Sequence, residues 1–237
     1  MPKNNLIQLS GPPGSGKSTT ARLLSGPLNA TIIDNDLLKS FFLENSVTSG
    51  AIDPFDEAAK LAYRLQWVLA EEFMAQGSTS ASQEGKSQGR EGATRSIIID
   101  CVVNYNEVLE TGQALADKYG WIYHYVEIRA DSLDLLDSRM KRRVPLRSQR
   151  TGVLGRPRDM PANAQMIESE VGMEDSGARK NGSGEDIGVE VEKMKQKLKE
   201  KWMNPKRPAD GGIVVSATGD LEERKVYILD KILGTDK

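Results

Sequence analysis

The chain has 237 residues, of which 38% are apolar, and its 32 Lys and Arg nearly balance its 34 Asp and Glu. This balance excludes a general nucleic-acid coat protein, which would be basic, and the length suits one domain over residues 1–237. The single cysteine, Cys101, excludes an internal disulfide framework and fits a reducing compartment. No apolar run approaches the roughly 18 residues that span a bilayer, and the first residues lack a secretory signal pattern. We therefore expect a cytoplasmic protein without a membrane partner.

Short apolar runs alternate with amphipathic segments along the chain, which is typical of a parallel sheet with helices on both faces. The clearest helix has Ala58, Leu61, Ala62 and Leu65 at helical spacing. We predict an α/β fold of three layers with a five-stranded parallel sheet. The predicted strands are 6–9, 30–33, 97–99, 121–128 and 213–215, and the predicted helices are 17–24, 36–43, 57–74, 106–118, 131–142 and 221–233.

Two segments, 77–95 and 172–188, interrupt this alternation. The first contains no Val, Ile, Leu, Met or aromatic residue, and the second is rich in Gly and charged residues. Such segments bury too little apolar surface to offset the entropy lost on ordering. We therefore predict that both are flexible surface insertions.

A glycine-rich loop follows the first predicted strand. Residues 11–18, Gly-Pro-Pro-Gly-Ser-Gly-Lys-Ser, fit the pattern G-x-x-x-x-G-K-[ST] at a strand-to-helix junction. Glycine at 14 and 16 lets backbone N–H groups approach a phosphate, and the helix N-terminus adds positive charge. We expect Lys17 to reach the β- and γ-phosphates of ATP and the Ser18 hydroxyl to ligate Mg²⁺. The predicted nucleotide-binding residues are Gly11, Gly14, Ser15, Gly16, Lys17, Ser18 and Thr19.

With this loop, the chain resembles P-loop kinases of the group that includes zeta toxins, chloramphenicol phosphotransferase and polynucleotide 5′-kinases. Residues 33–36, Ile-Asp-Asn-Asp, followed by Lys39, are similar to the segment after the second strand of zeta-toxin-like kinases. In that group the second acidic residue accepts the proton of the attacking hydroxyl, so the resemblance assigns this role to Asp36. The resemblance covers residues 5 to about 150 and, weakly, the last strand and helix. It also implies that residues 215–219 form a loop that contacts adenine.

Three aspartates follow predicted strands, at the sheet edge where open α/β sheets bind ligands. A carboxylate at Asp36 suits the orientation and deprotonation of a nucleophile in phosphoryl transfer. Asp34 is either a helix N-cap or a hydrogen-bond partner of the substrate. Asp100 ends a β-branched strand and either holds Mg²⁺, directly or through water, or caps the next helix.

The segment from Arg139 to Arg150 holds six basic residues and no acid. Such a run is either a solvated basic face or, as the resemblance implies from its place after the fourth strand and its helix, a lid over about 139–160. Arginine forks can neutralise charge on the transferring phosphoryl group, and a lid excludes water. Under the lid interpretation we expect Arg143, Arg147 and Arg150 to be catalytic.

We therefore expect an ATP- and Mg²⁺-dependent kinase that phosphorylates a hydroxyl of a small molecule, a nucleotide or a nucleic-acid end. Tyr63 and Trp67, on the helix at 57–74, either belong to the core or stack an acceptor base. The alternative is a regulatory ATPase or nucleotide-gated binding module acting on a protein or tRNA partner. Asp100 with Asn104 and Tyr105 keeps this alternative open, because it also resembles the seryl-tRNA kinase and Elongator-associated ATPase branch.

Overall fold

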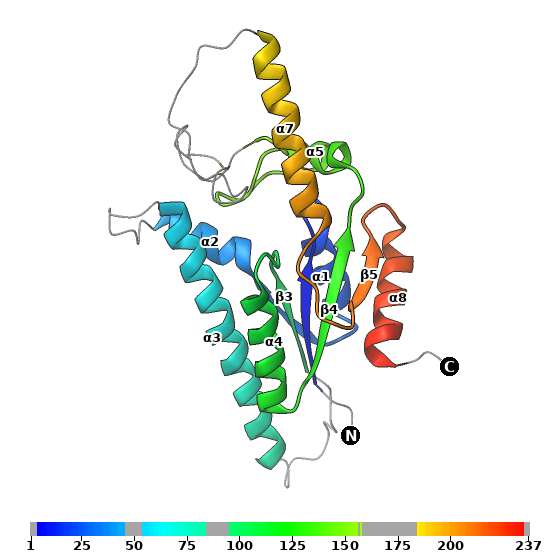
Figure 1. Ribbon diagram of the computed structural model, residues 1–237. Coiled ribbons are helices and arrows are strands. Elements are labelled where there is room, and N and C mark those ends of the chain that lie inside the picture. Colours follow the sequence, from blue (N-terminus) through cyan, green and yellow to red (C-terminus); the bar gives the residue numbers. More distant parts are fainter. Residues whose placement is uncertain (1–3, 46–53, 84–94, 156, 158–183, 235–237) are drawn as a thin grey trace.

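Five parallel strands form the centre of the computed structural model, which describes residues 4–45, 54–83, 95–155, 157 and 184–234 (Figure 1). The strands pair in the order β2-β3-β1-β4-β5, and each neighbouring pair is parallel. The predicted α/β fold with a five-stranded parallel sheet is confirmed. The strands are β1 (Asn5–Ser10), β2 (Ala30–Asp34), β3 (Ser96–Asp100), β4 (Ile122–Arg129) and β5 (Ile213–Ser216).

The helices agree with the sequence patterns except in two segments, helix α7 and the C-terminal part of helix α3. The pattern did not predict α7, which occupies residues expected in part to be an insertion. Residues 77–83, expected in the other insertion, instead continue α3, while 84–94 and 172–183 lie outside the described residues. The described helices are α1 (Lys17–Ser25), α2 (Asn35–Glu44), α3 (Pro54–Gln83), α4 (Asn106–Tyr119), α5 (Leu133–Arg142), α7 (Gly184–Met203) and α8 (Leu221–Leu233).

Alternate side chains of each strand point to opposite faces of the sheet, so the two faces bury different helices. On β3, Ile98 packs in a cluster with residues of α1, α5, α7 and α8, whereas Ile97 and Ile99 pack with residues of α3 and α4. Figure 1 shows α3 and α4 on one side of the sheet and α8 on the other. The molecule therefore has the three layers that the sequence predicts.

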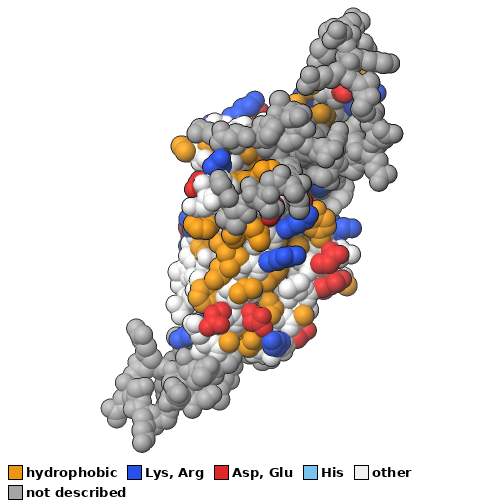
Figure 2. Space-filling view, turned by 90° about the vertical axis from the view of Figure 1, so that its left-hand side faces the viewer, with side chains coloured by type: hydrophobic (Ala, Val, Ile, Leu, Met, Phe, Trp, Pro, Cys, Tyr) orange, Lys and Arg blue, Asp and Glu red, His pale blue; other side chains and the backbone are white. Residues whose placement is uncertain are grey.

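The outer face of α3 carries exposed apolar side chains. Val68 and Phe73 on this helix are 61% and 37% exposed. Figure 2 looks at the left-hand side of Figure 1 and shows hydrophobic side chains over the middle of this face, with charged side chains among and around them. Within the described residues, no helix combines the length and apolar character that crossing a bilayer requires.

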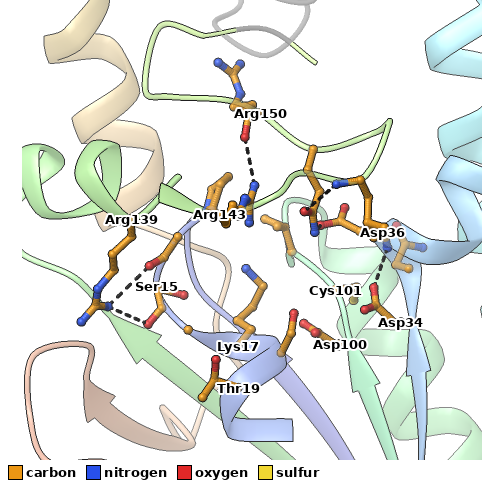
Figure 3. Close-up of a pocket in the computed structure, with 18 of the residues that line it drawn as sticks. Ser15, Lys17, Thr19, Asp34, Asp36, Asp100, Cys101, Arg139, Arg143 and Arg150 are labelled. Carbon is orange, nitrogen blue, oxygen red and sulfur yellow. Dashed lines mark hydrogen bonds between the residues drawn. The ribbon is translucent and has the colours of Figure 1, made fainter. Parts of the chain in front are cut away.

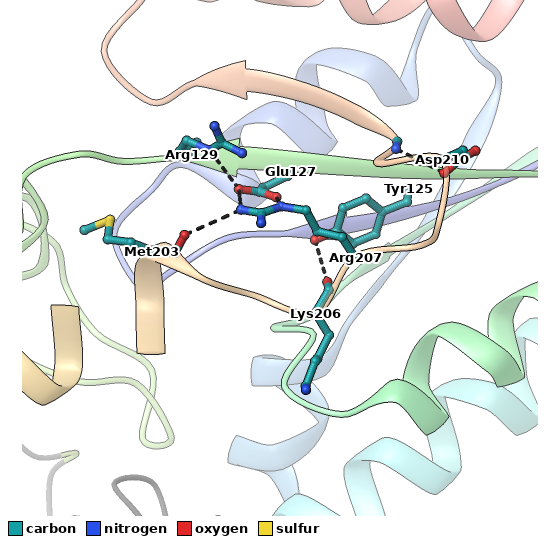
Figure 4. Close-up of polar contacts among 8 residues, drawn as sticks. Tyr125, Glu127, Arg129, Met203, Lys206, Arg207 and Asp210 are labelled. Carbon is teal, nitrogen blue, oxygen red and sulfur yellow. Dashed lines mark hydrogen bonds and ion pairs between the residues drawn. The ribbon is translucent and has the colours of Figure 1, made fainter. Parts of the chain in front are cut away.

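A buried carboxylate fastens the segment after α7 to the sheet (Figure 4). Glu127 on β4 is 2% exposed at its side chain, and its two oxygens accept from Nε and Nη2 of Arg207. Arg129 donates from Nε to the same carboxylate at 3.1 Å. The Tyr125 hydroxyl donates to the Lys206 carbonyl at 2.9 Å, one residue before Arg207. These contacts fix the approach to β5 and hence the position of the loop that follows β5.

We predict that Arg207→Met lowers the free energy of unfolding by about 2–3 kcal/mol, because it removes the bidentate partner of a buried charge. The control is Lys118→Met, which removes the exposed ion pair with Glu71 and should change the free energy of unfolding much less, because exposed ion pairs are screened by solvent. Urea unfolding of both variants measures the difference. If the two variants lowered the free energy of unfolding equally, the buried ion pair of Glu127 would contribute no more to stability than the exposed one.

Candidate functional site

The loop between β1 and α1 adopts a backbone that only glycine takes without strain. Gly11, Gly14 and Gly16 have φ of 138°, 82° and 101°. A Cβ at Gly11 would lie 2.4 Å from the Ile128 carbonyl oxygen, and one at Gly14 would lie 2.9 Å from the Leu136 carbonyl oxygen. The loop is thus wedged against the end of β4 and the start of α5.

Lys17 begins α1 and reaches back over this loop. Its Nζ donates to the carbonyls of Gly11 and Pro12 at 2.9 and 3.1 Å. The backbone N–H of Ser15 donates to Pro12 at 3.1 Å, whereas the Ser15 hydroxyl is buried and has no hydrogen-bond partner among the described residues. Figure 3 shows the Lys17 side chain entering the space enclosed by the loop, the acids and α5.

A single pocket of about 680 Å³ collects most of the predicted site. It lies where the carboxyl ends of β1, β2 and β3 meet the loop, as expected for an open parallel sheet. Of the loop residues predicted to bind nucleotide, Gly11 alone is not a lining residue. Those that line the pocket are Gly14, Ser15, Gly16, Lys17, Ser18 and Thr19, and beside them lie Asp34, Asp36, Asp100, Arg143 and Arg150.

Asp34 and Asp100 are paired residues in the register of β2 and β3, so their side chains lie side by side. Asp34 caps α2 by accepting from the backbone N–H groups of Asp36 and Leu37 at 3.0 and 3.2 Å. Burial, together with the negative charges of Asp100 and Asp36, raises the pKa of Asp34 to about 6. Asp34 is therefore the N-cap of α2, as one of the two alternatives predicted, and it also lines the pocket.

Asp100 is 4% exposed, and its Oδ2 has no hydrogen-bond partner among the described residues. Burial raises the pKa of Asp100, and the Lys17 ammonium and a hydrogen bond from Ser18 act in the opposite direction. It does not cap α4, whose N-cap is Tyr105. A buried carboxylate oxygen without a partner, beside a hydroxyl, is suited to a divalent cation that also binds phosphate. No group of three His, Cys, Asp or Glu in the described part of the chain could hold a metal alone.

Asp36 lies one residue into α2 and is held from the opposite side of the pocket. Its Oδ2 accepts from Gln149 Nε2 at 2.9 Å, and its carbonyl accepts from Ser148 Oγ at 2.9 Å. Nearby, Tyr63 donates its hydroxyl to the Val102 carbonyl at 2.9 Å. Trp67 packs against the buried cluster between the sheet, α3 and α4. These contacts favour the core alternative for Trp67 over base stacking.

The three predicted lid arginines separate into different positions. Arg143 lines the pocket, donates to the Arg150 carbonyl at 3.0 Å, and has its pKa lowered by burial although the Asp36 charge acts to raise it. Arg147 is not among the lining residues. The Arg150 guanidinium points away from the pocket in Figure 3, donates to the Val153 carbonyl, and lies 5.7 Å from the Trp202 ring. Of the three, only Arg143 is placed to meet a phosphoryl group. Residues 156 and 158–160 of the predicted lid lie outside the described residues.

Three further arginines line the pocket that the sequence did not single out, Arg22, Arg139 and Arg224. Arg139 on α5 donates to the carbonyls of Gly14, Ser15 and Ala217 at 3.5, 3.4 and 2.9 Å. Arg224 on α8 is 6% exposed, and burial together with the nearby Arg139 lowers its pKa. Arg139 belongs to the basic run at 139–150, so the sequence could have indicated it as a site residue. Arg224 could not be found in this way, because in the sequence it is an ordinary polar residue of an amphipathic helix. The expected adenine loop contributes Ala217 and Gly219 to the same wall.

Solved structures of kinases have a fold similar to that of this chain. A candidate kinase from Chloroflexus aurantiacus J-10-fl has a TM-score of 0.57 and 16% identity, over 99% of this chain and 98% of that one. A sugar kinase from Janibacter sp. HTCC2649 has a TM-score of 0.50 and 13% identity, over 98% of this chain and 95% of that one. No protein-family description and no curated protein matches the sequence. At these identities the similarity shows the fold alone, which is that of the P-loop kinases.

The raised pKa of Asp34 has a measurable consequence for stability. Because its pKa is about 6 in the folded protein against 3.8 as the reference, the folded state holds this proton more tightly than the unfolded state. The contribution to stability is present below pH 4 and is lost as pH rises through 6. Asp34→Asn keeps the capping oxygen and removes the charge. Between pH 4 and pH 7 the wild type should therefore lose about 2 kcal/mol more stability than the variant, as measured by urea unfolding at each pH. Parallel pH profiles would contradict the assignment.

Proposed function

We propose that this protein is an ATP- and Mg²⁺-dependent kinase that transfers the γ-phosphoryl group of ATP to a hydroxyl of a small molecule. The observation that carries the proposal is the convergence of Lys17, Asp36, Asp100 and Arg143 on one pocket beside the glycine loop. The fold of P-loop kinases supports it. So does the resemblance of Gly11–Ser18 and of residues 33–36 to the zeta-toxin, chloramphenicol phosphotransferase and polynucleotide kinase group.

In this proposal the loop and the N-terminus of α1 bind the phosphates, and Lys17 leaves its carbonyl contacts for the β- and γ-phosphates. Ser18 and Asp100 would hold Mg²⁺, which would supply positive charge to neutralise the phosphates. Asp36 accepts the proton of the acceptor hydroxyl. At the same time the hydroxyl oxygen bonds to the γ-phosphorus, and the bond between the γ-phosphorus and the bridging oxygen of ADP breaks. Arg143 stabilises negative charge on the phosphoryl group in transfer.

The acceptor half of the pocket favours a small molecule over a nucleic-acid end. Trp67 packs against the buried cluster between the sheet, α3 and α4 and does not line the pocket, so Tyr63 is the only ring among the described residues that line it, and no pair of rings is present on which a base could stack. Hydrogen-bonding side chains also line this half of the pocket, among them Asn35, Lys39 and Asn104. Such groups suit a polar, hydroxyl-bearing molecule.

We predict that Lys17→Met weakens ATP binding at least about 50-fold, since it removes the ammonium that would face the phosphates. Calorimetry with Mg²⁺ and ATP measures the affinity. The control is Lys60→Met, which breaks the exposed pair with Asp56 on α3 and should leave the affinity unchanged. Unaltered binding by the Lys17 variant would end the nucleotide-site assignment.

We predict that Asp36→Asn retains ATP affinity within about threefold and lowers phosphoryl transfer by at least about 100-fold. The asparagine oxygen can still accept from Gln149, so the exchange removes the basicity and keeps the contact. The assay incubates γ-labelled ATP with pools of polyols, sugars, nucleosides and oligonucleotide 5′-ends and follows the label. Label on an acceptor supports a kinase, whereas label only in inorganic phosphate supports a regulatory ATPase. Near-normal turnover in the variant would remove Asp36 from the mechanism.

A further inference from the structure

Buried hydroxyl groups join the turn after α5, residues 146–150, to α2, the helix that carries Asp36. Ser148 donates from Oγ to the Asp36 carbonyl at 2.9 Å, and its backbone N–H donates to Ser40 Oγ at 3.1 Å. Ser40 donates from Oγ to Ser148 Oγ at 2.9 Å. Ser40 and Ser148 are 2% and 6% exposed, so both hydroxyls are removed from water and fully used by one another and by the backbone.

Gln149 extends from this turn to the Asp36 side chain and is held at both ends of its amide. Nε2 donates to Asp36 Oδ2 at 2.9 Å, while Oε1 accepts from the Leu146 N–H at 3.2 Å. An amide fixed at its oxygen presents its N–H in one direction, so it restricts the rotation of the carboxylate that accepts from it. The contact joins residues 113 positions apart in the sequence.

The other end of the same turn holds Arg143. Its Nη2 donates to the Arg150 carbonyl at 3.0 Å, and the Arg150 side chain is anchored in turn on the Val153 carbonyl and beside the Trp202 ring. Asp36 and Arg143, which face each other across the pocket, therefore depend on one segment, residues 146–150.

We propose that Gln149 is a positioning residue for phosphoryl transfer, which orients the Asp36 carboxylate toward the acceptor hydroxyl. The serine pair Ser40 and Ser148 holds the turn that carries it. The inference rests on the proposed function, because it takes Asp36 as the group that orients the nucleophile. It also gives Arg150 a role: its carbonyl and side chain support the turn, and its guanidinium does not meet phosphate.

The decisive variant is Gln149→Glu, which keeps the size of the side chain and the acceptor for Leu146 but replaces the N–H that faces Asp36 with an oxygen. The rate of ADP formation from ATP, with water as the probe nucleophile, should fall about 10- to 100-fold, while ATP affinity measured by calorimetry stays within twofold. The matched control is Gln113→Glu on α4, where the glutamine donates to exposed Asp117 at the same 2.9 Å, and it should leave the rate within twofold of wild type.

A double-mutant cycle separates a role through Asp36 from a merely structural one. If Gln149 acts through Asp36, Gln149→Glu should change the rate less than twofold when it is added to Asp36→Asn. Additive losses would overturn the inference, as would a Gln149→Glu rate equal to wild type while Asp36→Asn is impaired. Absence of ADP formation by the wild type both with water alone and with the acceptor pools, or an unimpaired Asp36→Asn, would instead overturn the proposed function on which the inference rests.

Hydrogen exchange tests the docking of the turn without nucleotide. Ser40→Ala removes the acceptor of the Ser148 N–H, so amides of residues 146–150 should exchange at least threefold faster. Ser138→Ala on α5 removes an exposed hydroxyl that donates to Leu135 and should not change this exchange. Equal protection in wild type and Ser40→Ala would show that the serine pair does not hold the turn, and would overturn that part of the inference.

Discussion

The passage of the backbone from β1 past the end of β4 is the constraint on which the site depends. β1 is buried along its whole length and paired on both edges, so the chain leaving it has no freedom to move aside. At Gly11 a Cβ would lie 2.4 Å from the Ile128 carbonyl oxygen. The packing of the central strand thus sets where the loop turns, and the loop sets where α1 begins and from where Lys17 reaches the pocket.

Charge is distributed unevenly around that loop. Lys17, Arg139 and Arg224 surround it, and within the described residues they donate hydrogen bonds to neutral oxygens of the backbone and of Thr20. The acids gather instead at the ends of β2 and β3, where Asp34 and Asp100 are paired in register. In a chain of net charge −2, this leaves one half of the pocket suited to a polyphosphate and the other to a cation and a hydroxyl group.

The features that the sequence predicts are those that depend on local chemistry. A buried strand such as β3 needs β-branched residues, and the loop needs glycine at fixed positions, so both appear directly in the sequence. Helix α7 does not appear directly in the sequence. It packs on the core through Leu198 and Trp202, and the residues around these two in the sequence are mostly charged. The run of basic residues likewise could not predict where the Arg150 side chain points. Its direction is set by contacts with the Val153 carbonyl and with the ring of Trp202, which is 52 positions away in the sequence.

The two halves of the pocket are therefore held by different physical means. The phosphate side is fixed by backbone conformation within the core, which cannot change without disturbing β1 and β4. The acceptor side is fixed by side-chain hydrogen bonds between α2 and the turn at 146–150, through Ser40, Ser148 and Gln149. Each such bond contributes only about 1 kcal/mol net, but breaking one while the groups stay buried would cost about 1–3 kcal/mol for each hydroxyl or amide left without a partner. In the proposed reaction, any movement that admits an acceptor would therefore have to exchange these side-chain hydrogen bonds, while the glycine loop stays in place.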